Sequence, residues 1–285
     1  YQEWEPEGRI PVAADRTMYW DNPGYNNVWT EWIGGHASRG TTERSTIWYL
    51  SEGATHMFDM YVLVQNTDPD QDADIRITLM GLDGVLATVE QVITPLTRYT
   101  LYVNQVVGYD EPHVSAVVES LPRPAPAPSP HDATFIMCER AMYWKPFLNQ
   151  GNSSWAAGHD TIGALYAAPV WYLPEGATVG FDEYVLLANP DKTRTAEAEV
   201  TFYFETGAPE WMTVTIGPES RQTIYVNKVL NSPAIATRVE ETSEPFSAKI
   251  PIIAERAMYW HSYSPWVKWI AGHNTIGIPV RTEGK

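Results

Sequence analysis

The stretch Glu139-Arg140-Ala141-Met142-Tyr143-Trp144, followed by Trp155-Ala156-Ala157-Gly158-His159, represents a pattern that occurs three times along the chain. The other two copies have Met-Tyr-Trp at 18–20 and 258–260, and Trp-x-x-Gly-His at 32–36 and 269–273. A recurring pattern indicates a repeated structural unit rather than a single site. We therefore interpret each copy as the last strand of one unit and the joint to the next.

A second, longer repeat separates these joints. Residues 47–66 and 170–189 share 13 of 20 amino acids without a gap, including Trp-Tyr-Leu-x-Glu-Gly-Ala-Thr. This identity indicates an internal duplication, with a first repeat at 47–169 and a second repeat at 170–285, each with its linker. Residues 1–46 then form an isolated closing strand and a tryptophan-rich linker hairpin.

The residues between the joints alternate with a period of two. Ile75, Ile77 and Leu79 alternate with polar residues in the first repeat, as Val200 and Phe202 do in the second. This period is typical of strands with one buried face. About seven short strands per repeat predict an all-β fold: two tandem immunoglobulin-like antiparallel β-sandwiches with an extra N-terminal strand and hairpin.

The composition excludes several classes of partner. The chain has 285 residues, of which 35 are acidic and 19 basic, and its net charge of −16 repels phosphate backbones. We therefore predict no nucleic-acid partner. No apolar run reaches the ~18 residues of a membrane span, so we predict no membrane insertion. Cys138 is the only cysteine, which leaves no intrachain disulfide.

The histidines His36, His159 and His273 suggest a metal site, but each belongs to a separate copy of the motif. We expect them to lie one unit apart, where they cannot share an ion. The favoured interpretation is a turn histidine whose ring packs on the preceding tryptophan and bonds to the backbone.

Two carboxylate pairs resemble the acid pair of a glycosidase, Glu52 with Asp59 and Glu175 with Asp182. Two complete tandem sites are unusual in an enzyme. We predict that each aspartate caps a turn and that each glutamate pairs with an arginine such as Arg140 or Arg256. The prediction is a protein without enzymatic activity.

The acidic segment at 68–74 resembles the start of a calcium loop. It lacks the glycine at the sixth position and the glutamate at the twelfth that such loops need. We predict no cofactor, with a weak surface calcium site near Asp68, Asp70 and Asp72 as the alternative.

Tryptophan gathers in the three joints, where it could stack on sugars or form contacts between repeats or subunits. Its presence in every joint favours contacts between repeats or subunits. The predicted interface residues are Ile10, Val12, Tyr19, Trp20, Trp29, Trp32, His36, Trp144, Trp155, His159, Trp260, Trp266, Trp269, His273, Ile278 and Val280.

The motifs Trp-Tyr-Leu-x-Glu-Gly-Ala-Thr, Phe-Asp-x-Tyr, Tyr-Val-Asn, Glu-Arg-Ala-Met-Tyr-Trp and Trp-x-x-Gly-His together resemble a known family. It is a tandem β-sandwich repeat of bacterial secreted and cell-surface proteins, largely of unknown function. The resemblance covers residues 8–280 and implies export and a structural or adhesive role. Its departures are Asp15-Arg16-Thr17 in place of Glu-Arg-Ala, and no Trp-Tyr-Leu after Val280.

These observations predict an extracellular structural protein, a subunit of a filament or surface layer. An isolated closing strand exposes an edge that a neighbouring subunit can cover. A head-to-tail contact of this kind generates an open fibre unless it closes a ring. The predicted partners are further copies of the chain or other cell-surface proteins. The alternatives are a carbohydrate-binding or adhesion module of a larger secreted protein, with glycans as ligands, and a secreted hydrolase.

Overall fold

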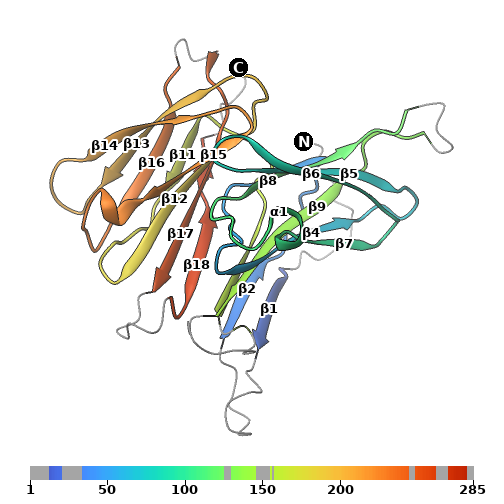
Figure 1. Ribbon diagram of the computed structural model, residues 1–285, viewed down its shortest axis with the longest axis horizontal. Coiled ribbons are helices and arrows are strands. Elements are labelled where there is room, and N and C mark those ends of the chain that lie inside the picture. The colour runs from blue at the N-terminus through green and yellow to red at the C-terminus, as the bar shows by residue number, and fades with distance from the viewer. Residues whose placement is uncertain are drawn as a thin grey trace, which may run out of the picture.

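The computed structural model describes residues 13–20, 34–124, 130–145, 155, 157–243, 248–260 and 269–280. Strands make up 57% of it, and its described helical segments are the short α1 (Asn104–Val107) and η1 (Val226–Lys228). The prediction of an all-β chain is therefore confirmed (Figure 1). In the described part of the chain, no helix has the length and apolar character needed to cross a membrane.

The strands of the first repeat form two antiparallel sheets of four strands. The first sheet has the order β10-β9-β4-β7, with β10 at Ala157–Ile162, β9 at Ile136–Trp144, β4 at Phe58–Asn66 and β7 at Arg98–Tyr102. The second has the order β3-β8-β5-β6, with β3 at Ile47–Leu50, β8 at Ser115–Leu121, β5 at Ala73–Met80 and β6 at Val85–Ile93.

The second repeat has the same strand order, with one further strand, β19, at the edge of its second sheet. One sheet reads β18-β17-β12-β15, with β18 at Gly272–Ile276, β17 at Ile253–Trp260, β12 at Phe181–Asn189 and β15 at Ser220–Tyr225. The other reads β19-β11-β16-β13-β14, with β19 at Ile278–Pro279, β11 at Val170–Leu173, β16 at Ala236–Glu241, β13 at Ala196–Tyr203 and β14 at Glu210–Ile216. A fifth, two-stranded sheet pairs β1 (Asp15–Trp20) with β2 (Gly34–Arg39).

The alternation of apolar and polar residues correctly predicted strands that bury one row of side chains. Ile75, Ile77 and Leu79 on β5 are at most 1% exposed, and Val200 and Phe202 on β13 are fully buried. Successive strand residues point to opposite faces, so this row packs into the core while its neighbours point away.

The hydrophobic core crosses the boundary between the two repeats. Tyr259 and Trp269 of the second repeat belong to the buried cluster of the first, while Met80 and Val117 of the first belong to that of the second. Burial of shared apolar surface stabilises the contact between the repeats.

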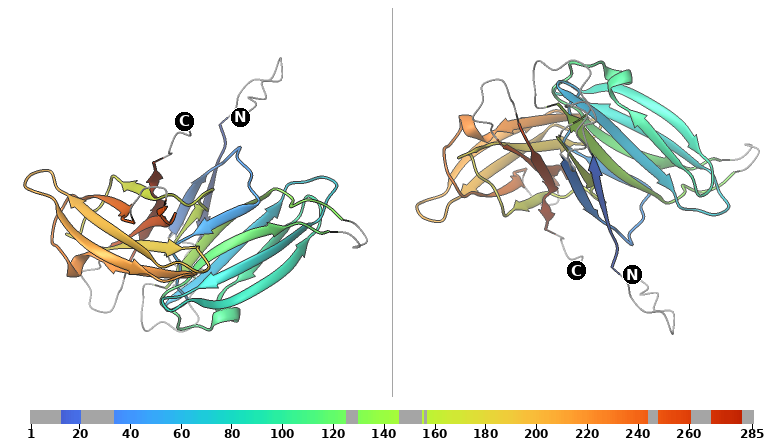
Figure 2. Two further views of the ribbon diagram at one scale, coloured as in Figure 1. Left: turned by 90° about the horizontal axis from the view of Figure 1, so that it is seen from above. Right: turned by 90° about the horizontal axis from the view of Figure 1, so that it is seen from below.

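The prediction of two tandem immunoglobulin-like β-sandwiches is wrong. The four larger sheets are arranged in a ring that resembles a four-bladed β-propeller. A sheet of a sandwich keeps one polar face toward solvent, whereas seven of the eight residues of β17 are buried. Both faces of that sheet are covered, because strands of the first repeat pack on the face that a separate sandwich would leave open. Seen from above or below, the blue β1–β2 hairpin lies between the two repeats (Figure 2).

Candidate functional site

Three β-hairpins built from the recurring motif stack on one another. We name them hairpin 1 (β1 and β2), hairpin 2 (β9 and β10) and hairpin 3 (β17 and β18). β2 packs against β10, and β10 packs against β18. In each hairpin the methionine of the motif lies opposite its histidine, in the pairs Met18 and His36, Met142 and His159, and Met258 and His273. The segments predicted as linkers therefore include sheet strands, and they form a regular stack.

The histidines lie on stacked strands, so the expectation that they are separated by a whole unit is wrong. Burial lowers the pKa of His159 well below its usual value, and the nearby charges of Arg140, His36 and His273 act in the same direction. Within the described residues, no group of three or more His, Cys, Asp or Glu side chains is placed to hold a metal ion.

Each histidine of the first two hairpins contacts a tyrosine of the next hairpin. His36 Nε2 lies 3.1 Å from the Tyr143 hydroxyl, and His159 Nε2 lies 3.2 Å from the Tyr259 hydroxyl. Each histidine ring packs on a tryptophan, but it is the tryptophan of the Met-Tyr-Trp triplet and not the preceding one of Trp-x-x-Gly-His that was expected. The centroid separations are 5.6 Å for Trp20–His36, 5.5 Å for Trp144–His159 and 5.3 Å for Trp260–His273. In the described contacts of His36 and His159, a tyrosine hydroxyl takes the place of the expected backbone bond.

An arginine of hairpin 1 pairs with a glutamate of hairpin 2. The Arg16 guanidinium donates to both carboxylate oxygens of Glu139, at 2.7 and 2.8 Å. It also contacts the Asp160 carboxylate, and the Ser38 hydroxyl donates to Glu139 at 2.8 Å. Two-pronged pairs of this kind fix orientation as well as adding energy.

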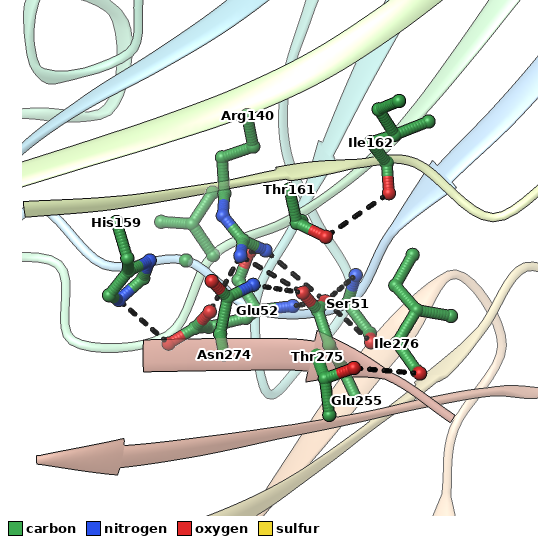
Figure 3. A network of polar contacts seen from close by, with 12 residues as sticks. Ser51, Glu52, Arg140, His159, Thr161, Ile162, Glu255, Asn274, Thr275 and Ile276 are labelled. Carbon is green, nitrogen blue, oxygen red and sulfur yellow. Dashed lines mark hydrogen bonds and ion pairs between the residues drawn. The ribbon is translucent and has the colours of Figure 1, made fainter. Parts of the chain in front are cut away.

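The same contact recurs between hairpins 2 and 3, fully buried (Figure 3). Arg140 Nη2 donates to Glu255 at 2.9 Å and to the Glu52 carboxylate at 2.6 Å. Glu255 also accepts from the backbone N–H of Glu52 at 2.7 Å and from the Asn274 amide at 2.9 Å. Figure 3 shows these side chains converging from three separated parts of the chain. In the dipeptide Glu139-Arg140, the glutamate thus faces back to hairpin 1 and the arginine forward to hairpin 3.

The two carboxylates that share Arg140 have different proton affinities. Burial raises the pKa of Glu52 to about 7. Burial acts in the same direction on Glu255, but Arg140 and the hydrogen bonds outweigh it and lower the pKa of Glu255. The Tyr259 hydroxyl donates to Glu52 at 2.7 Å. Arg140 therefore faces one firmly ionised carboxylate and one that is easily protonated.

A second buried arginine joins the repeats away from the hairpins. Arg221 on β15 donates to the backbone carbonyls of Gly53 at 2.8 Å and Val114 at 2.5 Å, both in the first repeat. Burial lowers its pKa to about 10, which leaves it charged at neutral pH. Sequence reasoning missed this contact. The sequence did contain a signal for it, because Arg98 is found at the aligned position of the first repeat.

The carboxylate pairs have structural contacts. The predicted pairing of glutamate with arginine is confirmed for Glu52 with Arg140 and for Glu175 with Arg256. Among the described contacts, both aspartates bind tyrosine and tryptophan side chains, where a turn cap was expected. Asp59 accepts from the Tyr102 hydroxyl and the Trp155 indole, and its counterpart Asp182 accepts from the Tyr225 hydroxyl and, at 2.6 Å, from the Trp269 indole. Each aspartate therefore holds the tryptophan of the following Trp-x-x-Gly-His motif in place.

Most described members of the predicted interface set lie in the three hairpins or pack on them. They are Tyr19, Trp20, His36, Trp144, Trp155, His159, Trp260, Trp269 and His273. Ile278 and Val280 lie elsewhere, where β19 extends the sheet beside β11 and Val280 N donates to Val170 O. Ile10, Val12, Trp29, Trp32 and Trp266 are outside the described residues.

Two of the described joint tryptophans, Trp144 and Trp269, are buried between the repeats. Trp144 is 1% exposed and its indole donates to the Trp269 carbonyl at 2.7 Å, while Trp269 is 8% exposed and stacks on Tyr259 at 4.6 Å. Trp155 stacks on Tyr143 at 4.7 Å. These rings are used in contacts within the molecule.

The acidic segment considered for calcium makes local contacts. Asp68 accepts from the backbone N–H groups of Asp70 and Gln71, both at 2.8 Å. Asp72 lies 3.3 Å from the Arg123 guanidinium. The Asp68 side chain therefore binds the backbone of its own turn.

Glu183 on β12 gives a test of stability against pH. It is fully buried where the first repeat has Met60, and burial raises its pKa to about 7. Because this pKa is above that of an exposed glutamate, the folded protein binds the proton of Glu183 more tightly than the unfolded chain does. The contribution of Glu183 to the free energy of unfolding is complete below about pH 4.5 and is lost as the pH rises through 7. We expect Glu183→Met to raise the free energy of unfolding at pH 8 by about 2–3 kcal/mol, with little gain at pH 4.5.

Urea denaturation of both proteins at the two pH values measures this effect. Glu90→Met, at a glutamate whose side chain is 63% exposed, is the control and should leave the pH profile unchanged. An equal gain from Glu183→Met at both pH values would show that ionisation of Glu183 is not the cause.

Comparison with known proteins places the chain in no family. No protein-family model matches it, and no curated protein does. One solved structure with partial similarity is "Crystal Structure of Thermotoga maritima 1070", at 18% sequence identity and a TM-score of 0.34, covering 40% of this chain and 96% of that chain. A similarity at this level carries no argument about function.

Proposed function

We propose that the protein is a structural assembly protein whose copies associate head to tail, as subunits of a filament or surface layer. The observation that supports this is the repetition of one contact step within the chain. From hairpin 1 to 2, and again from 2 to 3, an arginine meets a glutamate and a histidine meets a tyrosine hydroxyl. A contact used twice between units of one chain is suited to use between chains.

The geometry of the step favours an open assembly. Hairpin 2 uses Glu139 toward hairpin 1 and Arg140 toward hairpin 3, so the contact is heterologous. Repetition of a heterologous contact gives a fibre or a ring, not a closed twofold dimer. Repeat proteins bury their core by stacking neighbours in this way, with stability arising from each interface.

The residue types in the step suit a subunit interface. Tyr, Trp and Arg are favoured anchors at protein interfaces, and each step uses all three. The extracellular setting that we propose rests on the resemblance of the motifs to bacterial surface repeats.

Sedimentation velocity over a wide range of protein concentration tests this function. We expect a series of species that grows with concentration, and extended particles in negative-stain images. A single sedimenting species with the mass of one chain at every concentration would contradict the proposal. A single dimer that saturates would also contradict it, because a heterologous open contact has no reason to stop at two.

A further inference from the structure

We propose that the outer face of the sheet β19-β11-β16-β13-β14 binds an extended, β-linked polysaccharide chain. We name this surface the aromatic face, and it is formed by Trp211, Tyr203, Tyr172 and Arg238. It lies on a different sheet from hairpin 3. The binding activity is therefore additional to the proposed assembly and does not depend on it.

The pairing of the strands places one row of side chains across the aromatic face. Trp211 on β14 lies opposite Thr201 on β13, which lies opposite Arg238 on β16. Arg238 in turn lies opposite Tyr172 on β11. Residues directly opposite each other project from the same face of a sheet. Tyr203 follows Thr201 by two residues on β13, so it shares this face.

The three rings of the aromatic face are open to solvent. Trp211 is 66% exposed, Tyr172 is 44% exposed and Tyr203 is 40% exposed. The alternate residues of β13, Val200 and Phe202, are fully buried in the core, so the rings stand on the outer face of the sheet. Exposed aromatic side chains that gather on one surface mark a site of interaction.

The rings form an extended row. Neighbouring strands of a sheet lie about 4.8 Å apart, so the three strand spacings from β14 to β11 separate Trp211 and Tyr172 by about 14 Å. Tyr203 lies between them, one strand away from β14. A row of this length on the surface of a sheet suits a long chain that lies along it.

The first repeat shows the composition of the same face where it packs against protein. The positions equivalent to Tyr203 and Arg238 are occupied there by Met80 and Val117. Met80 is 1% exposed and Val117 is 8% exposed, because both pack into the core of the second repeat. The second repeat therefore has a phenol and a guanidinium where a covered face has aliphatic side chains.

The position of Trp211 is exposed in both repeats. Its equivalent in the first repeat is Thr88, which pairs with Thr78 as Trp211 pairs with Thr201. Thr88 is exposed although a second repeat follows the first. The exposure of Trp211 therefore agrees with the position that it occupies in the sheet, and the indole is the feature that the second repeat adds.

The charges on the aromatic face balance one another. Arg238 pairs with Glu240, and Lys249 Nζ lies 3.1 Å from the same carboxylate. Glu199 lies opposite Glu240 and accepts from the Thr201 hydroxyl at 3.0 Å. These two cations and two carboxylates give no net charge, in a chain whose net charge is −16. A neutral ligand complements such a surface, because a charged one meets no excess of the opposite charge.

A neutral sugar chain has the two properties that the aromatic face requires. The C–H face of a pyranose ring packs on an aromatic ring through dispersion contacts. Its hydroxyl groups bond to guanidinium, carboxylate and hydroxyl groups, which Arg238, Glu199 and Thr201 supply. A β-linked chain is extended and ribbon-shaped, so several of its sugar rings can pack along the row from Trp211 to Tyr172.

Depletion of the protein from solution by insoluble cellulose, chitin and peptidoglycan tests this activity. We expect the wild-type chain to bind at least one of these β-linked polymers and Trp211→Ala to weaken that binding at least tenfold. Trp211→Phe retains a ring and should weaken it less than threefold. Tyr109→Ala is the matched control, because Tyr109 is 63% exposed in the first repeat, and it should change binding less than twofold. Thermal melts verify that the variants are folded.

Wild-type protein that binds none of the three polymers would overturn the proposal, and so would equal binding by the wild type and Trp211→Ala. Sedimentation velocity without polysaccharide tests a second copy of the chain as the occupant. Weaker self-association of Trp211→Ala would show that the aromatic face is a contact between copies, and the polysaccharide would then be the wrong ligand.

Discussion

Replacing Arg140 with alanine is expected to lower the free energy of unfolding by about 3–5 kcal/mol. Arg140 is fully buried and binds Glu52 and Glu255. Its removal leaves two carboxylates facing each other in a site without solvent. Breaking a buried ion pair from one side is costly for this reason, even where the intact pair adds little net stability.

Urea denaturation at pH 7 measures this cost, and Arg76→Ala is the matched control. Arg76 pairs with Glu90 at 2.7 Å, but both side chains are exposed, and pairs of this kind contribute only about 0–1 kcal/mol. Equal effects of the two substitutions would contradict the assignment of Arg140 as the main polar contact between hairpins 2 and 3.

Replacing Trp144 with alanine is expected to cost about 3–5 kcal/mol, the usual range for a large buried aromatic side chain. Trp144 lies against Phe58, His159 and Tyr259, so the cavity would open between the repeats. The substitution also removes the indole donor to the Trp269 carbonyl, which leaves a buried acceptor without that partner.

Trp211→Ala is the control for this substitution. Trp211 lies on β14 and is 66% exposed, so its loss should change stability by less than about 0.5 kcal/mol. Equilibrium denaturation followed by circular dichroism compares the two variants. A loss below 1 kcal/mol at Trp144 would show that the contact between the repeats does not depend on this side chain.

The strands could be predicted from the sequence because their signal is local. The alternation at Ile75, Ile77 and Leu79 records which face of one strand is buried, and the structure confirms it. The pairing of Glu52 with Arg140 could also be predicted, because both residues recur in the second repeat.

The arrangement of the sheets could not be predicted in this way. In Glu255-Arg256 the charges suggest an exposed strand position, but both side chains are buried. They are compensated by groups more than 70 residues away in the chain, Arg140 for Glu255 and Glu175 for Arg256. A burial pattern read along one strand contains no information about a partner that covers its second face. For this reason the sequence suggested separate sandwiches where the sheets form a ring.

The roles of Asp59 and Asp182 were missed for a related reason. Each holds a tryptophan and a tyrosine that lie tens of residues further along the chain. Turn capping is a local interaction and was the natural expectation. The repetition of Asp, Tyr and Trp at matched positions was the signal that could have identified the contact.

Crosslinking between two single-cysteine variants tests most directly whether the step inside the chain is repeated between chains. Thr17→Cys lies on β1 of hairpin 1, and Thr275→Cys lies on β18 of hairpin 3. The native Cys138 is 3% exposed and burial raises its pKa, so it should not react. With a short bis-maleimide, we predict covalent dimers when the two variants are mixed and almost none with either variant alone. Equal yields from one variant alone, or no dimer in the mixture, would contradict a head-to-tail contact between hairpin 3 of one copy and hairpin 1 of the next.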